Sequence, residues 1–297
     1  MKNPLISIIT PAYKAENTIK RAVSSVIHQD FMDWEMIIIS DDYQNYSQIL
    51  KEDHIVDERL QFISTNKFGS GPSHARNKGL EVARGKYMAT LDADDEFKPQ
   101  KLSKMIPLVE RYGAAISDIE IRDNDSNLLL EKFNKLPNYE FLSPQDLPWV
   151  SLHTYSIYLY DATKIPNLYY DTDFPSIEDL VFVMSFFNDI ECIGFEHEPL
   201  HIYYKRKGSA CNSADTHETF HKSKNKLLEK INNGQISIQN NLAKAECIKI
   251  TNLSLETDNI YDLEILKNPQ TDWLEILKTK IQDRDFLGYV NFLRNEV

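Results

Sequence analysis

Acidic side chains are concentrated in the segment Asp92-Ala93-Asp94, which Asp95 and Glu96 follow directly. Mg²⁺ and Mn²⁺ prefer oxygen ligands, and protein carboxylates often share them with the phosphates of a substrate. Two carboxylates separated by one residue can face the same pocket when a buried strand precedes them. The segment therefore predicts a site for Mn²⁺ or Mg²⁺ with Asp92 and Asp94 as ligands. A solvated acidic turn is the alternative.

Two other carboxylates follow or begin regular segments. Asp41 ends an apolar run, where it can accept a hydrogen bond from a base or ribose, or act as a turn residue. Asp179 lies in Ser176-Ile177-Glu178-Asp179, at the start of a predicted helix. An ionised carboxylate there can serve as a general base, and the competing interpretation is a capping box with Ser176.

Cationic side chains suited to a diphosphate occur at two places. Arg76, in Ala75-Arg76-Asn77, offers a fork of donors that fits a phosphate or a uracil carbonyl. Its alternative is a surface helix residue paired with Glu81 or Asp92. The segment 204–209 contains Arg206 and Lys207, which can neutralise a departing diphosphate or belong to an ordinary solvated turn.

Alternating strand and helix patterns must position these side chains. Apolar runs predict strands over 5–10, 36–39, 60–64 and 86–91. Helical spacing predicts one helix capped by Asn17, a second from Ser73 to about Ala83 that ends before Gly85, and a third near Ser176. The alternation predicts a doubly wound, mainly parallel α/β sheet. Such sheets bind ligands beyond the carboxyl ends of their strands, where residues 10–13, 41–42 and 92–95 follow.

The chain changes character after Asp215, where long helical patterns begin. We therefore predict an α/β catalytic domain over 1–212 and a helical extension over 213–297. Packing of these helices on the domain is the expected arrangement. Contact with a membrane surface and formation of a homo-oligomer remain open alternatives.

Composition excludes several functional classes. The 297 residues carry a formal net charge of −12, which disfavours nucleic acid as a partner. The three cysteines form no CxxC pair, so a disulfide framework is not expected and a reducing cytoplasm fits. The first apolar segment, 5–10, is too short for a signal peptide, and 180–187 is too short for a membrane span. We expect a cytoplasmic protein, with peripheral binding at the inner face of the membrane left open.

Together these segments resemble glycosyltransferase family 2, the inverting enzymes of the GT-A fold. The resemblance rests on SIITPAYKAENTIKRAVSSVIHQ, WEMIIISDD, SHARNKGLEVARGKYMATLDADDEFKP, SIEDLVF and YYKRKGSAC, which occur in the family's order between about Ile6 and Cys211. It implies a nucleoside-diphosphate sugar donor, with UDP favoured, and a glycan or lipid-linked acceptor. Bacterial surface polysaccharide synthesis is the usual setting of the family.

The resemblance also implies roles for individual residues. Pro11, Tyr13 and Asp41 would line the nucleobase pocket, and Arg76 would contact the base or the diphosphate. Asp92 would contact the ribose or the metal, and Asp94 would ligate the metal. Asp179 would deprotonate the acceptor hydroxyl, and Arg206 and Lys207 would close on the diphosphate.

The chain departs from the family pattern at three places. Lys14 replaces the usual asparagine, Tyr43-Gln44 replaces Gly-Ser, and Lys207 stands where some members have a histidine near the metal. These changes put the base preference and a histidine ligand in doubt, and His201 is expected in the core or on the surface. On the acceptor side, five residues could form aromatic platforms for a sugar, although most of them are expected in the core or an interface, namely Trp149, His153, Tyr155, Tyr169 and Tyr170.

Two other functions compete with glycosyl transfer. A sugar-nucleotide nucleotidyltransferase would show a Gly-rich basic loop after the first strand, which Thr10-Pro11-Ala12-Tyr13 does not provide. A non-catalytic scaffold with a degenerate glycosyltransferase fold has no need of Asp92, Asp94 and Asp179, all of which are present.

Overall fold

The computed structural model describes residues 3–132, 140–146, 158–206 and 216–268, together with 271, 273, 276, 277, 279 and 280. Of the predicted site residues, Lys207 lies outside this part of the chain. So do Trp149, His153 and Tyr155.

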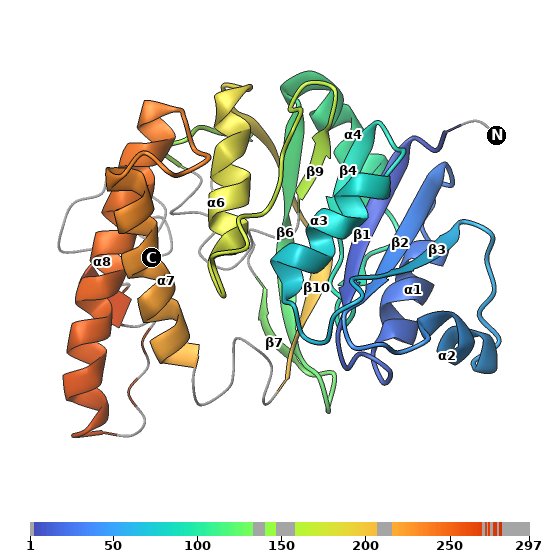
Figure 1. Cartoon of the computed structure of the whole chain (residues 1–297), viewed down its shortest axis with the longest axis horizontal. Helices are drawn as coiled ribbons and strands as arrows, with labels where there is room; N and C mark the ends of the chain where they lie inside the picture. The colour runs from blue at the N-terminus through green and yellow to red at the C-terminus, as the bar shows by residue number, and fades with distance from the viewer. Residues whose placement is uncertain are drawn as a thin grey trace.

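A single mixed sheet forms the centre of the molecule (Figure 1). Its strand order is β3-β2-β1-β4-β9-β6-β10-β5, with β7 paired to β6 and β8 paired to β10. The strands are β1 (Ile6–Ala12), β2 (Trp34–Ser40), β3 (Leu60–Ser64), β4 (Tyr87–Thr90), β5 (Glu96–Phe97), β6 (Ala114–Asp123), β7 (Leu129–Lys132), β8 (Phe141–Leu142), β9 (Tyr158–Asp161) and β10 (Ile193–Lys205).

The four predicted strands are confirmed as β1 to β4, and they pair in parallel. Strand β9 is antiparallel to both β4 and β6, and the short strands β5, β7 and β8 also pair antiparallel, so the sheet is mixed. The helices are α1 (Ile19–Ile27), α2 (Tyr46–Glu52), α3 (Pro72–Val82), α4 (Lys101–Tyr112), α6 (Glu178–Met184), α7 (Thr216–Asn232) and α8 (Asn241–Ile265), with a 3₁₀ turn at Ser185–Asn188. The predicted α/β class is confirmed.

Three predicted helix caps are wrong. Asn17 and Ser176 each lie two residues before the first helical residue, and Ser73 lies inside α3. The structure has Thr18, Gly71 and Ile177 at the cap positions, and none of them makes a side-chain cap hydrogen bond. Local propensity for a cap is therefore overridden at all three helix starts.

The core has two main parts. One lies between β1, β2 and the helices α1 and α4, and includes Ile8, Val23 and Met105. The other lies beneath α6 and includes Tyr158, Phe182 and Phe186, whose rings contact one another. A small third cluster, Ile9, Ile37, Ile39 and Ala75, joins α3 to the sheet.

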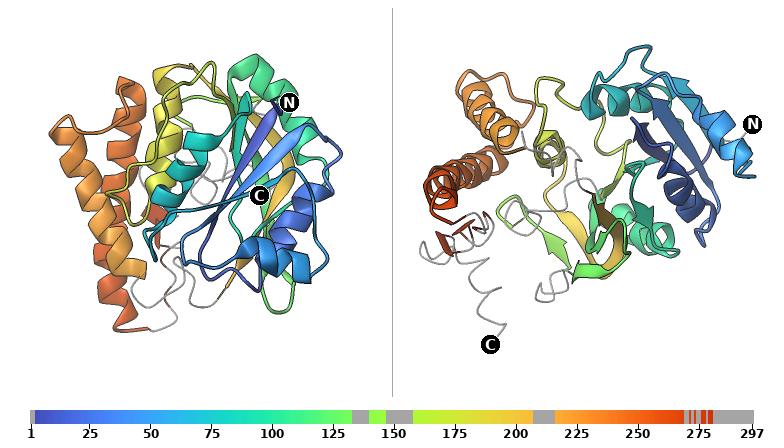
Figure 2. Two further views of the ribbon diagram at one scale, coloured as in Figure 1. Left: turned by 45° about the vertical axis from the view of Figure 1, so that its right-hand side comes forward. Right: turned by 90° about the horizontal axis from the view of Figure 1, so that it is seen from below.

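Helices α7 and α8 pack beside each other on the α6 side of the molecule, away from β1 to β3 (Figures 1 and 2). Leu227 and Ile231 of α7 and Cys247 of α8 share the core that contains Phe182 of α6. The described part of the extension therefore packs on the α/β region. The division at residue 212 stays a prediction. No described helix is long and apolar enough to cross a membrane.

Candidate active site

The carboxyl ends of three neighbouring strands gather the predicted polar segments. Asp41 follows β2 and donates its backbone N–H to the Ala12 carbonyl at the end of β1 (2.9 Å). On the other side of β1, the Leu91 N–H after β4 donates to the Ile9 carbonyl (3.1 Å). The prediction that these segments meet at one sheet edge is confirmed.

Arg76 connects this edge to α6. Its guanidinium lies 2.8 Å from Asp92 Oδ1, 3.0 Å from Glu178 Oε1 and 3.3 Å from Asp179 Oδ1. The arginine side chain is buried, only 3% exposed, so it is not the surface residue of the alternative interpretation. The pairing with Asp92 that this interpretation included does occur, whereas Glu81 pairs with Lys78. One cation thus holds three carboxylates from two distant parts of the chain.

The start of α6 directs its acidic residues toward Arg76. Ile177, directly before the helix, has φ of +61°, a left-handed conformation that is rare for a β-branched residue. The Ser176 hydroxyl donates to Ser223 Oγ (2.9 Å) on α7 and caps nothing in α6. The capping interpretation of Asp179 is therefore wrong, and strain at Ile177 accompanies the exposure of Glu178 and Asp179 to the arginine.

The excess of negative charge around Arg76 shifts one pKa in particular. Burial raises the pKa of Asp179 to about 7; the Arg76 guanidinium opposes this rise, and Glu178 and Asp92 add to it. A carboxyl group with a pKa near neutrality can accept a proton from a hydroxyl and release it again at physiological pH. The Asp179 side chain keeps 23% of its surface exposed, so a substrate can reach it.

Asp94 lies opposite the end of β10. Arg206, the first residue after that strand, approaches its carboxylate to 3.1 Å. Burial, with the nearby charges of Asp95 and Asp92, raises the pKa of Asp94 to about 7, although Arg206 lowers it. The acidic segment is therefore a partly buried, like-charged group next to a cationic side chain, and not the solvated turn of the alternative interpretation.

A divalent cation suits this arrangement. Asp92 and Asp94 are both partly exposed and offer hard oxygen ligands, and burial, with the charge of Asp92, raises the pKa of Asp94 although each carboxylate already contacts one arginine. No group of three or more acidic, histidine or cysteine ligands is found among the described residues. A cation held here would therefore complete its coordination with water or substrate phosphates, as Mg²⁺ commonly does.

The predicted nucleobase residues surround the ends of β1 and β2. Pro11 is the penultimate residue of β1, and the exposed Tyr13 ring lies 5.6 Å edge-on from Phe68. Asp41 is buried and accepts hydrogen bonds from Thr65 Oγ1 (2.7 Å) and the Gly71 N–H (2.9 Å). The Asp41 carboxylate therefore connects loop 65–71 to the sheet through hydrogen bonds. Its contact with a nucleobase remains a prediction.

Sequence reasoning missed two residues that shape this site. Glu178, adjacent to the predicted base, is a second α6 partner of Arg76. Arg21 of α1 donates to the Asp94 carbonyl and stacks over the Tyr204 ring at 3.5 Å. The position of Arg21 on a helix offers no local signal. The adjacent acidic residues Glu178 and Asp179 do offer a signal in the sequence, because a helix cap needs only one carboxylate.

The remaining predictions concern His201 and two tyrosines. His201 is buried beside Asp95 (3.1 Å), and burial lowers its pKa well below the usual value, so of the two expected locations, core and surface, it occupies the core. Tyr170 is buried and stacks on Phe182 at 3.9 Å, as expected of a core residue. Tyr169 is exposed.

Known proteins of one family are similar to this chain. The model of the family described as glycosyl transferase family 2 matches residues 7–166, more than half of the chain. A putative teichuronic acid biosynthesis glycosyltransferase of Bacillus subtilis, TuaG, is 40% identical over 115 residues, which cover 38% of this chain and 45% of the relative. The UDP-Glc:alpha-D-GlcNAc-diphosphoundecaprenol beta-1,3-glucosyltransferase WfgD of Escherichia coli is 34% identical over 128 residues, 42% of this chain and 50% of the relative.

These matches span about half the length of the curated relatives. Among solved structures, S. aureus TarS 1–349 in complex with UDP-GlcNAc is similar with a TM-score of 0.62 at 18% identity. That likeness covers 93% of this chain and 80% of the other. At this level of identity it establishes a shared fold.

Proposed function

The chain belongs to glycosyl transferase family 2, and we propose that it transfers a sugar from a nucleoside diphosphate to a glycan or lipid-linked acceptor with inversion at the anomeric carbon. The observation that carries this proposal is the position of Asp179. It is a partly exposed carboxyl group with a pKa of about 7 that shares Arg76 with Asp92 at the ligand-binding edge of the sheet.

Asp179 is the proposed general base. It accepts the proton of the acceptor hydroxyl while that oxygen bonds to the anomeric carbon. The bond from the anomeric carbon to the diphosphate oxygen breaks on the opposite face, and its electron pair leaves with the nucleoside diphosphate. Arg76 is a positioning residue because it contacts Asp179 from a buried side, and Glu178 is a second one that acts through its own contact with Arg76.

Charge on the departing diphosphate needs cations. Arg206 lies beside Asp94 and is proposed, with Lys207, to face the diphosphate. Asp92 and Asp94 would hold Mn²⁺ or Mg²⁺, which supplies further neutralisation of the leaving group. UDP is the proposed nucleotide, supported by the UDP-glucose in the name of the Escherichia coli relative and by the UDP-GlcNAc with which TarS forms its complex.

The setting we propose is synthesis of a bacterial surface polysaccharide in the cytoplasm. It is supported by the teichuronic acid biosynthesis named for TuaG and by the lipid-linked acceptor named for WfgD. An acceptor of that kind would bring the protein to the inner face of the membrane as a peripheral partner.

A binding panel tests the donor and the metal. UDP, GDP, CDP and dTDP are compared by thermal shift and calorimetry, each with and without Mn²⁺, on the wild type and on Asp94→Ala. We expect UDP to raise the melting temperature only with Mn²⁺, because a ligand that binds the native state stabilises it, and we expect Asp94→Ala to abolish the effect. If no diphosphate shifts the protein under any condition, a non-catalytic scaffold becomes the better interpretation.

A further inference from the structure

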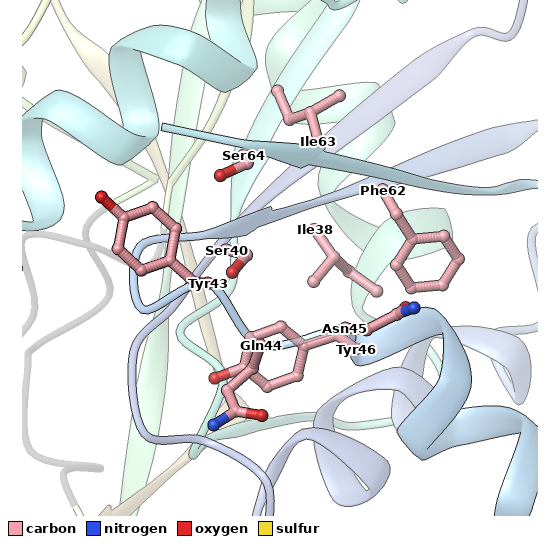
Figure 3. A pocket seen from close by; sticks show the side chains of 9 residues that line it. All are labelled: Ile38, Ser40, Tyr43, Gln44, Asn45, Tyr46, Phe62, Ile63 and Ser64. Atoms are coloured by element: carbon pink, nitrogen blue, oxygen red, sulfur yellow. The ribbon is translucent and has the colours of Figure 1, made fainter. Parts of the chain in front are cut away.

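A pocket of about 350 Å³ lies outside the candidate active site, between the ends of β2 and β3 and the start of α2 (Figure 3). Its walls are Ile38, Ser40, Tyr43, Gln44, Asn45, Tyr46, Phe62, Ile63 and Ser64. The volume is near the lower end of the range of about 300–1,000 Å³ for small-molecule sites. It suits a ligand of one or two ring units.

This pocket is on the opposite face of the sheet from α3. Side chains alternate along a strand, and Ile37 and Ile39 pack with Ala75 of α3. Ile38, between them, packs in the other core with Tyr46 of α2, and it lines the pocket. By contrast, the Asp41 carboxylate accepts a hydrogen bond from the N–H of Gly71, the residue directly before α3. The pocket therefore lies on the other face of β2 from the Asp41 carboxylate, and its Tyr43 ring borders Phe68, which contacts the ring of Tyr13.

The polar groups of the pocket are hydroxyls and amides, and none of its lining residues is charged. A diphosphate or a metal would find no ionic partner among them. Within the described part of the chain, the Gln44 side-chain amide and Asn45 Nδ2 make no hydrogen bond, and Asn45 Oδ1 accepts only from the Gln48 N–H. The unused donors and acceptors fit a neutral ligand rich in hydroxyl groups.

Three aromatic residues line the pocket, Tyr43, Tyr46 and Phe62, and Figure 3 shows the Tyr43 ring directed away from Phe62. Phe62 is 38% exposed on the edge strand β3, and Tyr43 is 66% exposed. Tyr43 has φ of +63°, a left-handed conformation that is uncommon for a non-glycine residue. A sugar ring has an apolar C–H face and a hydroxyl edge, so rings beside free amides match it in both respects.

We propose that this pocket binds a neutral sugar unit of the glycan, away from the reaction centre. That the sugar belongs to the glycan acceptor or product rests on the proposed function, whereas the chemistry of the pocket does not. Occupancy of such a site raises the local concentration of a tethered acceptor end. A long acceptor would therefore have a lower KM than a short one, at similar kcat.

The test uses three neutral probes, maltotetraose, N,N′,N″,N‴-tetraacetylchitotetraose and laminaritetraose, with calorimetry and saturation-transfer NMR on the full chain. The variants are Gln44→Ala and Phe62→Ala, and the matched control is Gln48→Ala, an exposed glutamine on α2 outside the pocket. We expect at least one probe to bind, at least tenfold weakening in Gln44→Ala, and no change in the control. Phe62→Ala should weaken binding similarly, and thermal melts identify a variant that fails to fold.

Three results would overturn the proposal: no probe binds, binding survives both pocket variants, or the variants abolish self-association seen by sedimentation, which would assign the pocket to a second copy of the chain. UDP binding with Mn²⁺ is measured on the same samples. A protein that binds a probe through the pocket but not UDP contradicts the proposed donor site alone. One that binds UDP but no probe contradicts the pocket alone.

Discussion

Among the described residues, two of the clusters of buried charged side chains lie at the sheet edge and in the helical extension. At the sheet edge, the single cation Arg76 faces Asp92, Glu178 and Asp179. In the extension, the single carboxylate of Asp258 accepts from Lys224 Nζ (2.8 and 2.9 Å), His221 Nδ1 (3.0 Å) and Trp273 Nε1 (2.8 Å).

The two clusters are opposite in electrostatic balance. Asp258 is completely buried, and its two oxygens have donors on several sides, so it resembles a structural ion pair. The Arg76 cluster has more carboxylates than one guanidinium can neutralise, and it leaves Asp179 with a raised pKa and an exposed surface. Removing one partner of a paired buried charge costs stability, whereas a cluster with unbalanced charge is a candidate for chemistry.

Replacement of Asp179 should give the largest effect. Asp179→Asn removes the proposed base while keeping the side-chain shape, so kcat should fall by about 10²–10⁴-fold. Donor affinity should change little. Steady-state kinetics and calorimetry with the nucleotide separate the two quantities. The matched control is Asp189→Asn, an exposed residue beyond the other end of α6. Equal kcat in both variants would remove Asp179 from the mechanism.

Replacement of Asp258 should act on stability instead. Asp258→Ala leaves the buried Lys224 ammonium without its carboxylate, so the free energy of unfolding should fall by about 3–5 kcal/mol. Urea denaturation measures the change, and nucleotide affinity of the remaining folded protein should be unaltered. Asp262→Ala, at a more exposed position of the same helix, should cost less than about 1 kcal/mol. If Asp258→Ala lost activity without losing stability, the distinction between a structural cluster and a chemical one would be wrong.

The pH dependence of turnover directly tests the excess of negative charge around Arg76. Asp179 must be ionised to accept a proton, and its pKa is about 7. Activity should therefore be lost as the pH falls and rise about tenfold from pH 6 to pH 8. Glu178→Gln removes a negative charge that raises the pKa of Asp179, so it should move the midpoint to lower pH. Glu81→Gln, on the exposed side of α3, should not move it. An unshifted midpoint in Glu178→Gln would show that Glu178 does not act through charge.

The smallest effect is expected at His221, the most exposed partner of Asp258. Its side chain is 39% exposed, so the contact is screened by solvent. His221→Ala should lower the free energy of unfolding by less than about 1 kcal/mol, because Lys224 and Trp273 still donate to the carboxylate. A loss comparable to that of Asp258→Ala in urea denaturation would mean that the cluster depends on all of its members.

Part of the site could be predicted because its signals are local. Apolar runs identified β1 to β4, and the polar residues directly after β2 and β4 had to lie at one edge once the strands were parallel. Helix starts were less predictable, since Gly71 and Ile177 stand at cap positions for which serine looked better suited. Neither α4 nor β6 was predicted. Pro107 inside α4 obscures the helical pattern there.

The sequence by itself therefore determined the first four strands, the family and the identity of the acidic segments, because each depends on residues close together in the chain. Only the tertiary structure decided which carboxylates share a cation. Arg76 and Asp179 are 103 positions apart, and no periodicity encodes their contact. The same holds for Asp41, whose carboxylate is bound by loop 65–71. Charge balance in a buried site depends on what folding brings together, so it became visible only when the sheet edge, α3 and α6 were placed side by side.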